Sequence, residues 1–277
     1  MNKLTFHDLQ FALLRAPKAL LQVMKKPEWA NKVFVGGGYL RAIVAGEPVN
    51  DIDVFVTCKD DADRLALALL MAQEKVEFTV CGKAADFAKS VKQRIYTTDN
   101  AVTLPGFKTT IQIIHRWTFT HPWEVINSFD FSICGAVFWW AGEAAEAGTM
   151  AGWQSLVLDR FYADLASKRL VYQAPARIED AGGSLLRVLK YYAKGYRIPI
   201  DSMGSVMARM VCGVEPKKVM GIDGKGWDEV QLAKVLTGLL REVDPNIDPS
   251  HVAHLPAEGG SQEEARKAAI ENAGGEL

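Results

Sequence analysis

Hydrophobic and polar positions repeat with two different periods in the first half of this chain. Leucines at rough helical spacing predict a helix over residues 5–25, which Pro17 should kink or split because proline lacks the backbone N–H. Alternating or β-branched apolar runs predict strands at 33–35, 51–57, 76–80, 93–98 and 108–115. Helical spacing predicts helices at 38–45 and 60–71. The first half is therefore expected to combine strands and helices.

The pattern becomes helical in the second half. Small residues from Gly142 to Gly152 indicate a boundary, and the spacing beyond it predicts helices at 158–167, 184–195, 202–211 and 228–241. The end of the chain is rich in alanine, glycine and glutamate, which is typical of a flexible tail. The expected organisation is an N-terminal helical segment at 1–30, an α/β domain at 31–150, a helical domain at 151–245, and a loop with a flexible acidic tail at 246–277.

Two aspartates, Asp51 and Asp53, stand at the start of the strand expected at 51–57. Residues i and i+2 of a strand point to the same face, about 6.5 Å apart along the chain. The two carboxylates should therefore project together, with Ile52 and Val54 on the other face. Such a pair suits two Mg²⁺ ions that clamp the attacking and leaving oxygens of a phosphoryl displacement. Asp51 and Asp53 are accordingly the candidate catalytic metal ligands.

Three glycines, Gly36, Gly37 and Gly38, join the strand at 33–35 to the helix at 38–45. Backbone N–H groups without side chains can approach a phosphate, and the positive end of a helix favours an anion. Arg41 follows this loop and is a candidate phosphate ligand, with a solvated helix position as the alternative. The glycines do not extend to a P-loop or to a dinucleotide-binding motif, which excludes both of those classes.

A family resemblance rests on these residues. Gly-Gly-Tyr-Leu-Arg at 37–41, Gly46, and Asp-Ile-Asp at 51–53 resemble the signature of class II CCA-adding enzymes and bacterial poly(A) polymerases, which belong to the DNA polymerase beta-like nucleotidyltransferases. The resemblance implies an α+β fold: a nucleotidyltransferase head with a mixed β-sheet and flanking helices, then a helical neck. It also implies an enzyme that transfers a nucleoside monophosphate from an NTP, ATP foremost, with Mg²⁺ or Mn²⁺ as cofactor.

The chain departs from the family pattern at three places. The third acid of the superfamily corresponds to Gln112, whose amide oxygen can ligate Mg²⁺ but brings no charge. Ser128 and Phe129 replace two arginines before Asp130, which the resemblance makes a nucleotide contact and which is otherwise a structural hydrogen-bond acceptor. The neck motif Glu-Asp-x-x-Arg keeps its acids but has Gly183 or Ser184 at the arginine position. For Gln112, either the two aspartates suffice, which we favour, or Asp130 contributes, or the site is weakened. The broken neck motif, reinforced by the missing arginines, predicts a relaxed or altered choice of NTP.

A basic segment follows the broken neck motif. Arg187, Lys190 and Lys194 share helical spacing, with Arg197 beyond them and two tyrosines, Tyr191 and Tyr192, among them. Arg187 and Lys190 are candidate nucleotide ligands, because charge and stacking suit a base, a triphosphate or an RNA backbone. The alternative is a solvated basic face with the tyrosines in the core.

Composition bears on the size of the core, the partners of the protein and its compartment. Hydrophobic residues make up 49% of 277, enough for a sizeable core in one or two domains. A net charge of −1 provides no global field for nucleic acid, so any basic surface must be local. No apolar run reaches the ~20 residues of a membrane span. Scattered cysteines argue against a zinc site and suit a reducing compartment, so a cytoplasmic protein without a secretory signal is expected.

The expected function is template-independent transfer of a nucleoside monophosphate, with an RNA 3′ end as the acceptor that the resemblance implies. Two alternatives stay open. One is transfer to a protein or small molecule, as in toxin or resistance enzymes. The other is a catalytically silent module that binds nucleotide or RNA. The sequence leaves the oligomeric state open.

Overall fold

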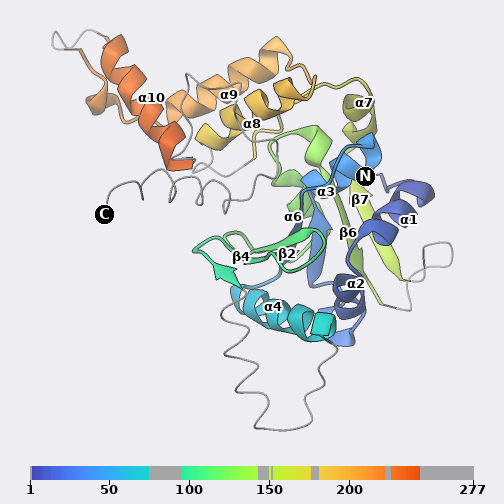
Figure 1. Ribbon diagram of the computed structural model, residues 1–277. Helices are drawn as coiled ribbons and strands as arrows, with labels where there is room; N and C mark the ends of the chain where they lie inside the picture. The colour runs from blue at the N-terminus through green and yellow to red at the C-terminus, as the bar shows by residue number, and fades with distance from the viewer. Residues whose placement is uncertain are drawn as a thin grey trace, which may run out of the picture. The chain divides into compact units, whose positions relative to one another are not determined.

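The computed structural model describes residues 2–74, 95–142, 150, 152–175, 181–221 and 226–243 (Figure 1). The chain divides into two compact units. The first comprises Met1–Phe129 and Ile133–Leu165, and the second comprises Asp130–Ser132 and Ala166–Leu277. Each unit is described by itself below. The strand expected at 76–80, the acids Glu179 and Asp180, and the tail at 246–277 lie outside the described residues.

A seven-stranded mixed sheet forms the centre of the first unit, in the order β3-β4-β5-β2-β1-β6-β7. Its strands are β1 Val33–Gly36, β2 Asp51–Val56, β3 Tyr96–Thr97, β4 Ala101–Leu104, β5 Thr110–Ile114, β6 Ala136–Trp140 and β7 Trp153–Val157. Only the β2–β5 pair is parallel among the described strands, and the other neighbours are antiparallel. The expected α+β class with a mixed sheet is confirmed.

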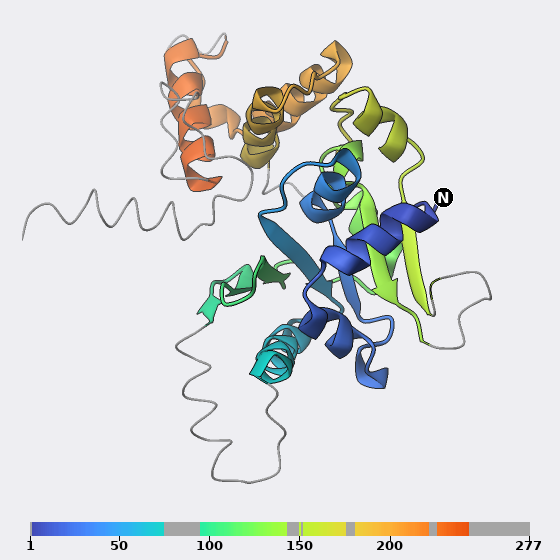
Figure 2. The same ribbon diagram turned by 45° about the vertical axis from the view of Figure 1, so that its right-hand side comes forward.

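Helices flank this sheet. They are α1 Phe6–Arg15, α2 Lys18–Met24, η1 Pro27–Trp29, α3 Gly38–Ala45, α4 Lys59–Glu74, α6 Pro122–Asn127, η2 Ser132–Cys134 and α7 Phe161–Ala166. Pro17 splits the N-terminal helix as expected, because it stands as the N-cap of α2. Helix α2 packs against α4, and the two lie side by side in both views (Figure 1, Figure 2). Helix α6 packs on β1, β6 and β7.

The sheet extends further along the chain than the sequence indicated. β7 begins beyond residue 150, where the α/β domain was expected to end, yet it pairs with β6 from Trp153 to Val157. The division between the two compact units falls at Leu165. Strand β4 is not among the strands expected from the sequence, because Ala101–Leu104 has only four residues, too few to show a clear period.

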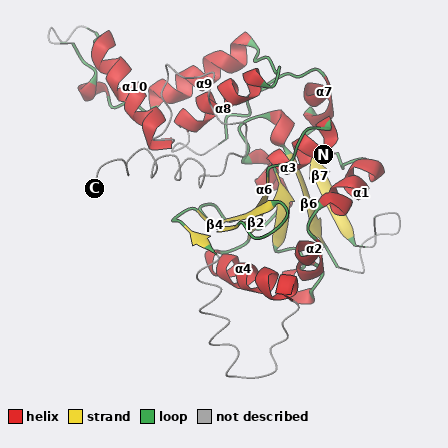
Figure 3. Ribbon diagram, in the orientation of Figure 1, coloured by secondary structure: helices red, strands yellow, loops and turns green. Residues whose placement is uncertain are grey.

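The described part of the second unit is mainly helical, as its red ribbons in Figure 3 show. It contains α8 Ala181–Ala193, α9 Ile200–Cys212, η3 Pro216–Lys218 and α10 Glu229–Val243. Helix α8 packs against both α9 and α10. Aromatic rings form its buried centre: Phe131 lies edge-on to Tyr191, and Tyr191 lies edge-on to Tyr196. The expected helical region thus has a core of its own, and its assignment as a neck remains a prediction.

Candidate active site

Strand register brings the predicted metal ligands together in the first unit. Asp53 pairs with Gly36 of β1 on one side and with Gln112 of β5 on the other. Burial alternates along β2, with Ile52 and Val54 fully buried and Asp51 and Asp53 partly exposed. Paired residues of neighbouring strands share a face of the sheet. Asp51, Asp53 and Gln112 therefore lie on one face, which places three side-chain oxygen donors side by side.

The glycine loop adjoins Asp53. Gly37 is the N-cap of α3 and has φ 70° and ψ −137°, a conformation that residues with a side chain rarely adopt. A Cβ atom at Gly36 would lie 2.8 Å from the Ala136 carbonyl oxygen, and one at Gly37 would lie 3.3 Å from Asp53 Oδ2. A Cβ at Gly38 would meet nothing within 4 Å. Side chains are thus excluded at the first two glycines, while Gly38 faces open space at the start of α3.

Phe129 lies against the same loop. Its ring would be 3.0 Å from a Cβ at Gly37, and it makes an edge-on contact with Phe55 at 5.7 Å between ring centroids. The alternation of β2 puts Phe55 and Asp53 on the face that α6 covers, and Phe129 follows the end of α6. An apolar ring therefore occupies the position where the family resemblance has an arginine. No cation is supplied to a phosphate from this position.

Arg41 is buried rather than solvated. Its side chain is 3% exposed, and it forms an ion pair with Glu47, just beyond the C-cap glycine of α3. The alternative of a solvated helix position is wrong, because the guanidinium lies inside the first unit. The pair joins the middle of α3 to the turn that leads into β2. The expected phosphate contact of Arg41 stays a prediction.

Tyr39 fixes the other side of α3. Its hydroxyl donates a hydrogen bond of 2.6 Å to the carbonyl oxygen of Ala12 in α1, and the side chain is almost fully buried. Burial raises the pKa of the Tyr39 phenol well above its usual range, so the group stays a neutral donor. The helix that begins at the glycine loop is thus held from both faces.

The remaining candidates lie in the second unit. Asp130 is 2% exposed and forms an ion pair with Arg187 of α8, which is 37% exposed. The Asp130 carbonyl oxygen also accepts a hydrogen bond of 2.7 Å from Gln173 N. These contacts give Asp130 the hydrogen-bonding role that the sequence analysis left as the alternative, and its contact with a nucleotide stays a prediction. Lys190 is partly exposed on α8.

The sequence left open whether the tyrosines of α8 are exposed for stacking or buried in the core, and the structure has one of each kind. Tyr191 is 1% exposed and belongs to the core, whereas Tyr192 is 57% exposed. Arg197 places its guanidinium 4.3 Å from the centre of the Tyr192 ring. Neither this contact nor the pair between Asp130 and Arg187 follows a sequence period, so neither could be predicted from the pattern.

The side-chain oxygens of Asp51, Asp53 and Gln112 suit a hard divalent cation. Among the described residues no three His, Cys, Asp or Glu side chains are grouped so that they could hold a metal ion. The strand register instead combines two carboxylates with the amide of Gln112. Carboxylate and amide oxygens are ligands that Mg²⁺ accepts. The fit therefore depends on oxygen chemistry, with less negative charge than three acids would supply.

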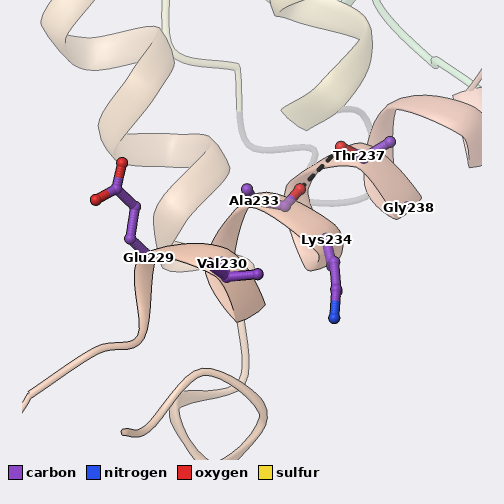
Figure 4. A pocket seen from close by; sticks show the side chains of 6 residues that line it. All are labelled: Glu229, Val230, Ala233, Lys234, Thr237 and Gly238. Atoms are coloured by element: carbon purple, nitrogen blue, oxygen red, sulfur yellow. Dashed lines mark hydrogen bonds between the residues drawn. The ribbon is translucent and has the colours of Figure 1, made fainter.

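A hollow of about 540 Å³ lies on the second unit, along one side of α10 (Figure 4). It is lined by Glu229, Val230, Ala233, Lys234, Thr237 and Gly238. The Thr237 hydroxyl donates to the Ala233 carbonyl oxygen at 2.8 Å, which satisfies that hydroxyl within the helix. This hollow contains none of the residues that the sequence analysis singled out.

The sheet, the glycine loop and the paired aspartates together define a nucleotidyltransferase-like α+β fold. A family model described as "Gad2: Gabija anti-defense 2 family protein" matches residues 16–168. This match covers more than half of the 277 residues, and the chain belongs to the Gabija anti-defense 2 family.

Solved structures of the group named by the motif resemblance are also similar to the chain. One is the Thermotoga maritima CCA-adding enzyme complexed with tRNA, at 15% identity and a TM-score of 0.46 over 97% of this chain and 62% of that one. Another is a tRNA nucleotidyltransferase complexed with a primer tRNA and an incoming ATP analog, at 14% identity and a TM-score of 0.45. The match covers 78% of this chain and 60% of that one. A third is a tRNA-processing enzyme with CTP, at 14% identity and a TM-score of 0.42 over 65% of this chain and 43% of that one.

The chain covers 43% to 62% of the length of these three solved structures. The comparison with curated proteins gave no match. No helix in the described part of the chain is long and apolar enough to cross a membrane.

Proposed function

We propose that this protein is a metal-dependent nucleotidyltransferase that transfers a nucleoside monophosphate from an NTP. The observation that carries the proposal is the shared face of Asp51, Asp53 and Gln112 beside the glycine loop. An anion-binding helix start and a set of oxygen ligands adjoin each other there. Phosphoryl transfer needs both, because the charge of the phosphates must be held and neutralised while the acceptor attacks.

Each part of the site has a role in this proposal. The backbone N–H groups at Gly37 and Gly38 hold the triphosphate at the start of α3. Asp51 and Asp53 hold Mg²⁺ or Mn²⁺, with Gln112 as a neutral third ligand. The bound metal supplies charge neutralisation and activation of the attacking oxygen. The acceptor oxygen forms a bond to the α-phosphorus and loses its proton, while the bond from that phosphorus to the leaving pyrophosphate breaks.

ATP is the expected donor, with a choice of base that is not strict. In the enzymes that the motif resembles, an acid and an arginine of the neck motif select the base by paired hydrogen bonds, and such bonds carry most of the discrimination. The arginine position of the neck motif carries Gly183 or Ser184, and Phe129 stands where another arginine would be. The protein therefore lacks the arginines that would make such hydrogen bonds to the nucleotide.

An RNA 3′ end is the first candidate acceptor, because the glycine and aspartate motif resembles enzymes that extend RNA. Membership of the Gabija anti-defense 2 family supports a second candidate, in which the acceptor is a component of the Gabija defence. In that case transfer would modify the component covalently and so oppose the defence. Both candidates use the same site and the same donor, and they differ only in the acceptor.

A labelling experiment tests the site. The purified protein is incubated with each α-labelled NTP and Mg²⁺, Mn²⁺ or EDTA, in the presence of total RNA or of purified Gabija proteins. We expect metal-dependent label on one acceptor and its loss in Asp51→Asn and Asp53→Asn. The matched control is Asp63→Asn, which removes one exposed carboxylate from α4 of the same unit.

The results separate the possibilities. Label that moves with RNA supports the first acceptor, and label on a Gabija protein supports the second. Label that persists in both aspartate variants would refute the metal assignment. If neither RNA nor a Gabija protein is labelled although the protein binds NTP, both candidate acceptors are refuted, which favours another acceptor or a silent binding module.

A further inference from the structure

Two exposed arginines face each other in the second unit. Arg169 and Arg197 form a parallel β-bridge, in which Leu170 N donates to the Arg197 carbonyl at 2.9 Å and Arg197 N donates to the Lys168 carbonyl at 2.8 Å. Residues paired on a bridge place their side chains on the same side. The backbone therefore fixes two guanidinium-bearing side chains next to each other at the surface.

An exposed aromatic ring adjoins this pair. Arg197 lies over the Tyr192 ring at 4.3 Å from its centre, and Arg197 Nη1 also donates to the Tyr196 carbonyl oxygen at 2.9 Å. Tyr192 is 57% exposed, although Tyr191 beside it in the chain is 1% exposed. We call Arg169, Tyr192 and Arg197 the basic patch. The bridge fixes the backbone positions of Arg169 and Arg197, and the cation–π contact places Arg197 over Tyr192.

The positive charge of the basic patch indicates that its ligand is an anion. The bridge pairs two arginines whose side chains leave the backbone on the same side, so an anion can be approached by both of them. The surrounding stretches 166–175 and 181–200 contain lysines and arginines but neither aspartate nor glutamate. Guanidinium groups bind phosphate through paired N–H donors, and an exposed aromatic ring stacks on a base.

We propose that the basic patch binds a single-stranded nucleic acid, with a phosphate between Arg169 and Arg197 and a base against Tyr192. The proposal rests on the proposed function only for the role of the bound nucleic acid, which would be the acceptor of the nucleoside monophosphate or part of that acceptor. Binding itself needs neither the aspartates nor a nucleotide donor. Its failure is therefore distinguishable from a failure of transfer.

The experiment measures binding by the full chain without NTP and with EDTA. The probe is a fluorescent oligouridine of about 12 nucleotides, within the usual site sizes for single strands, and its anisotropy is followed at several salt concentrations. The charge variant is the double change Arg169→Gln and Arg197→Gln. Its matched control is Lys217→Gln, an exposed cation of η3 in the same unit. Tyr192→Ala tests stacking, and Tyr192→Phe keeps the ring.

We expect the double variant to lower the dependence of log affinity on log salt by about 0.7, because it loses one phosphate contact and each phosphate on a single strand contributes about that much. Tyr192→Ala should weaken binding about 5- to 100-fold, the range for one stacked base, and Tyr192→Phe should bind as the wild type does. Lys217→Gln should keep both the affinity and the salt dependence. Circular dichroism establishes that each variant is folded.

Three results would overturn the proposal. The first is an effect of the double variant no larger than twice that of Lys217→Gln, because two charges are removed against one, and this would mean that only net charge is sensed. The second is displacement of the probe by free UTP at the same concentration as by unlabelled strand, which would assign the patch to a free nucleotide. The third is displacement by polyglutamate as readily as by RNA, which would assign it to an acidic protein surface.

Discussion

Substitutions in the glycine loop should separate stability from nucleotide binding. Gly37 has φ 70° and ψ −137°, and a new Cβ there would lie 3.0 Å from Phe129 Cε1 and 3.2 Å from its Cζ. A strained backbone of this kind costs about 1–3 kcal/mol in residues other than glycine. Restricting the unfolded chain by Gly→Ala offsets about 0.4–1 kcal/mol. Gly37→Ala should therefore lose about 1–2 kcal/mol of the free energy of unfolding.

Gly38 provides the matched control one residue further on. It is the first residue of α3, and a Cβ there would meet nothing within 4 Å. Gly38→Ala should keep the stability of the wild type or raise it by up to about 1 kcal/mol, since alanine is a better helix former. Gly38→Val should fold as well, but its branched side chain would stand where the triphosphate approaches. NTP affinity should then fall much more than RNA affinity.

Thermal unfolding followed by circular dichroism, together with NTP titration, tests both claims. A loss of about 1–2 kcal/mol corresponds to a Tm lower by about 2–8 °C for a domain of 150–250 residues. Combining Gly37→Ala with Phe129→Leu should recover the part of the loss due to the ring contact and leave the backbone part. The reasoning is refuted if Gly37→Ala melts with the wild type, or if Gly38→Val binds NTP with unchanged affinity.

Three further substitutions test the surroundings of the site. Asp53→Asn should melt at the same temperature as the wild type or higher, because it relieves repulsion with Asp51, and a melting curve against Asp63→Asn checks this. Asp130→Asn should cost about 1–3 kcal/mol in urea unfolding, since it leaves Arg187 without its charged partner. The backbone hydrogen bond from His121 lowers the pKa of Glu124, so the stabilisation from Glu124 is present above the unfolded pKa and is lost as pH falls through the lowered pKa. Glu124→Ala should cost about 0.5–1 kcal/mol at pH 7, and urea unfolding at successively lower pH should show this cost disappearing.

The sequence predicted those parts of the fold that depend on local pattern. The strand carrying Asp51 and Asp53 and the helix after the glycine loop follow from residue spacing alone. The register that places Gln112 beside Asp53 joins residues far apart in the chain, so the pattern could indicate only neighbouring strands. The burial of Arg41 depends on Glu47, which lies beyond the helix that carries Arg41. Such contacts follow from tertiary packing and have no period in the sequence.

The departures from the family pattern share one physical character. The backbone features remain: the glycine conformation, the helix start, and the pairing of β1, β2 and β5. The features that change are charged side chains, with Gln112 for an acid and Phe129 for an arginine. In the proposed function the triphosphate is therefore held mainly by backbone N–H groups and the metal. Because those contacts do not distinguish one base from another, a site reduced in this way is suited to chemistry in which the acceptor, rather than the nucleotide, is selected.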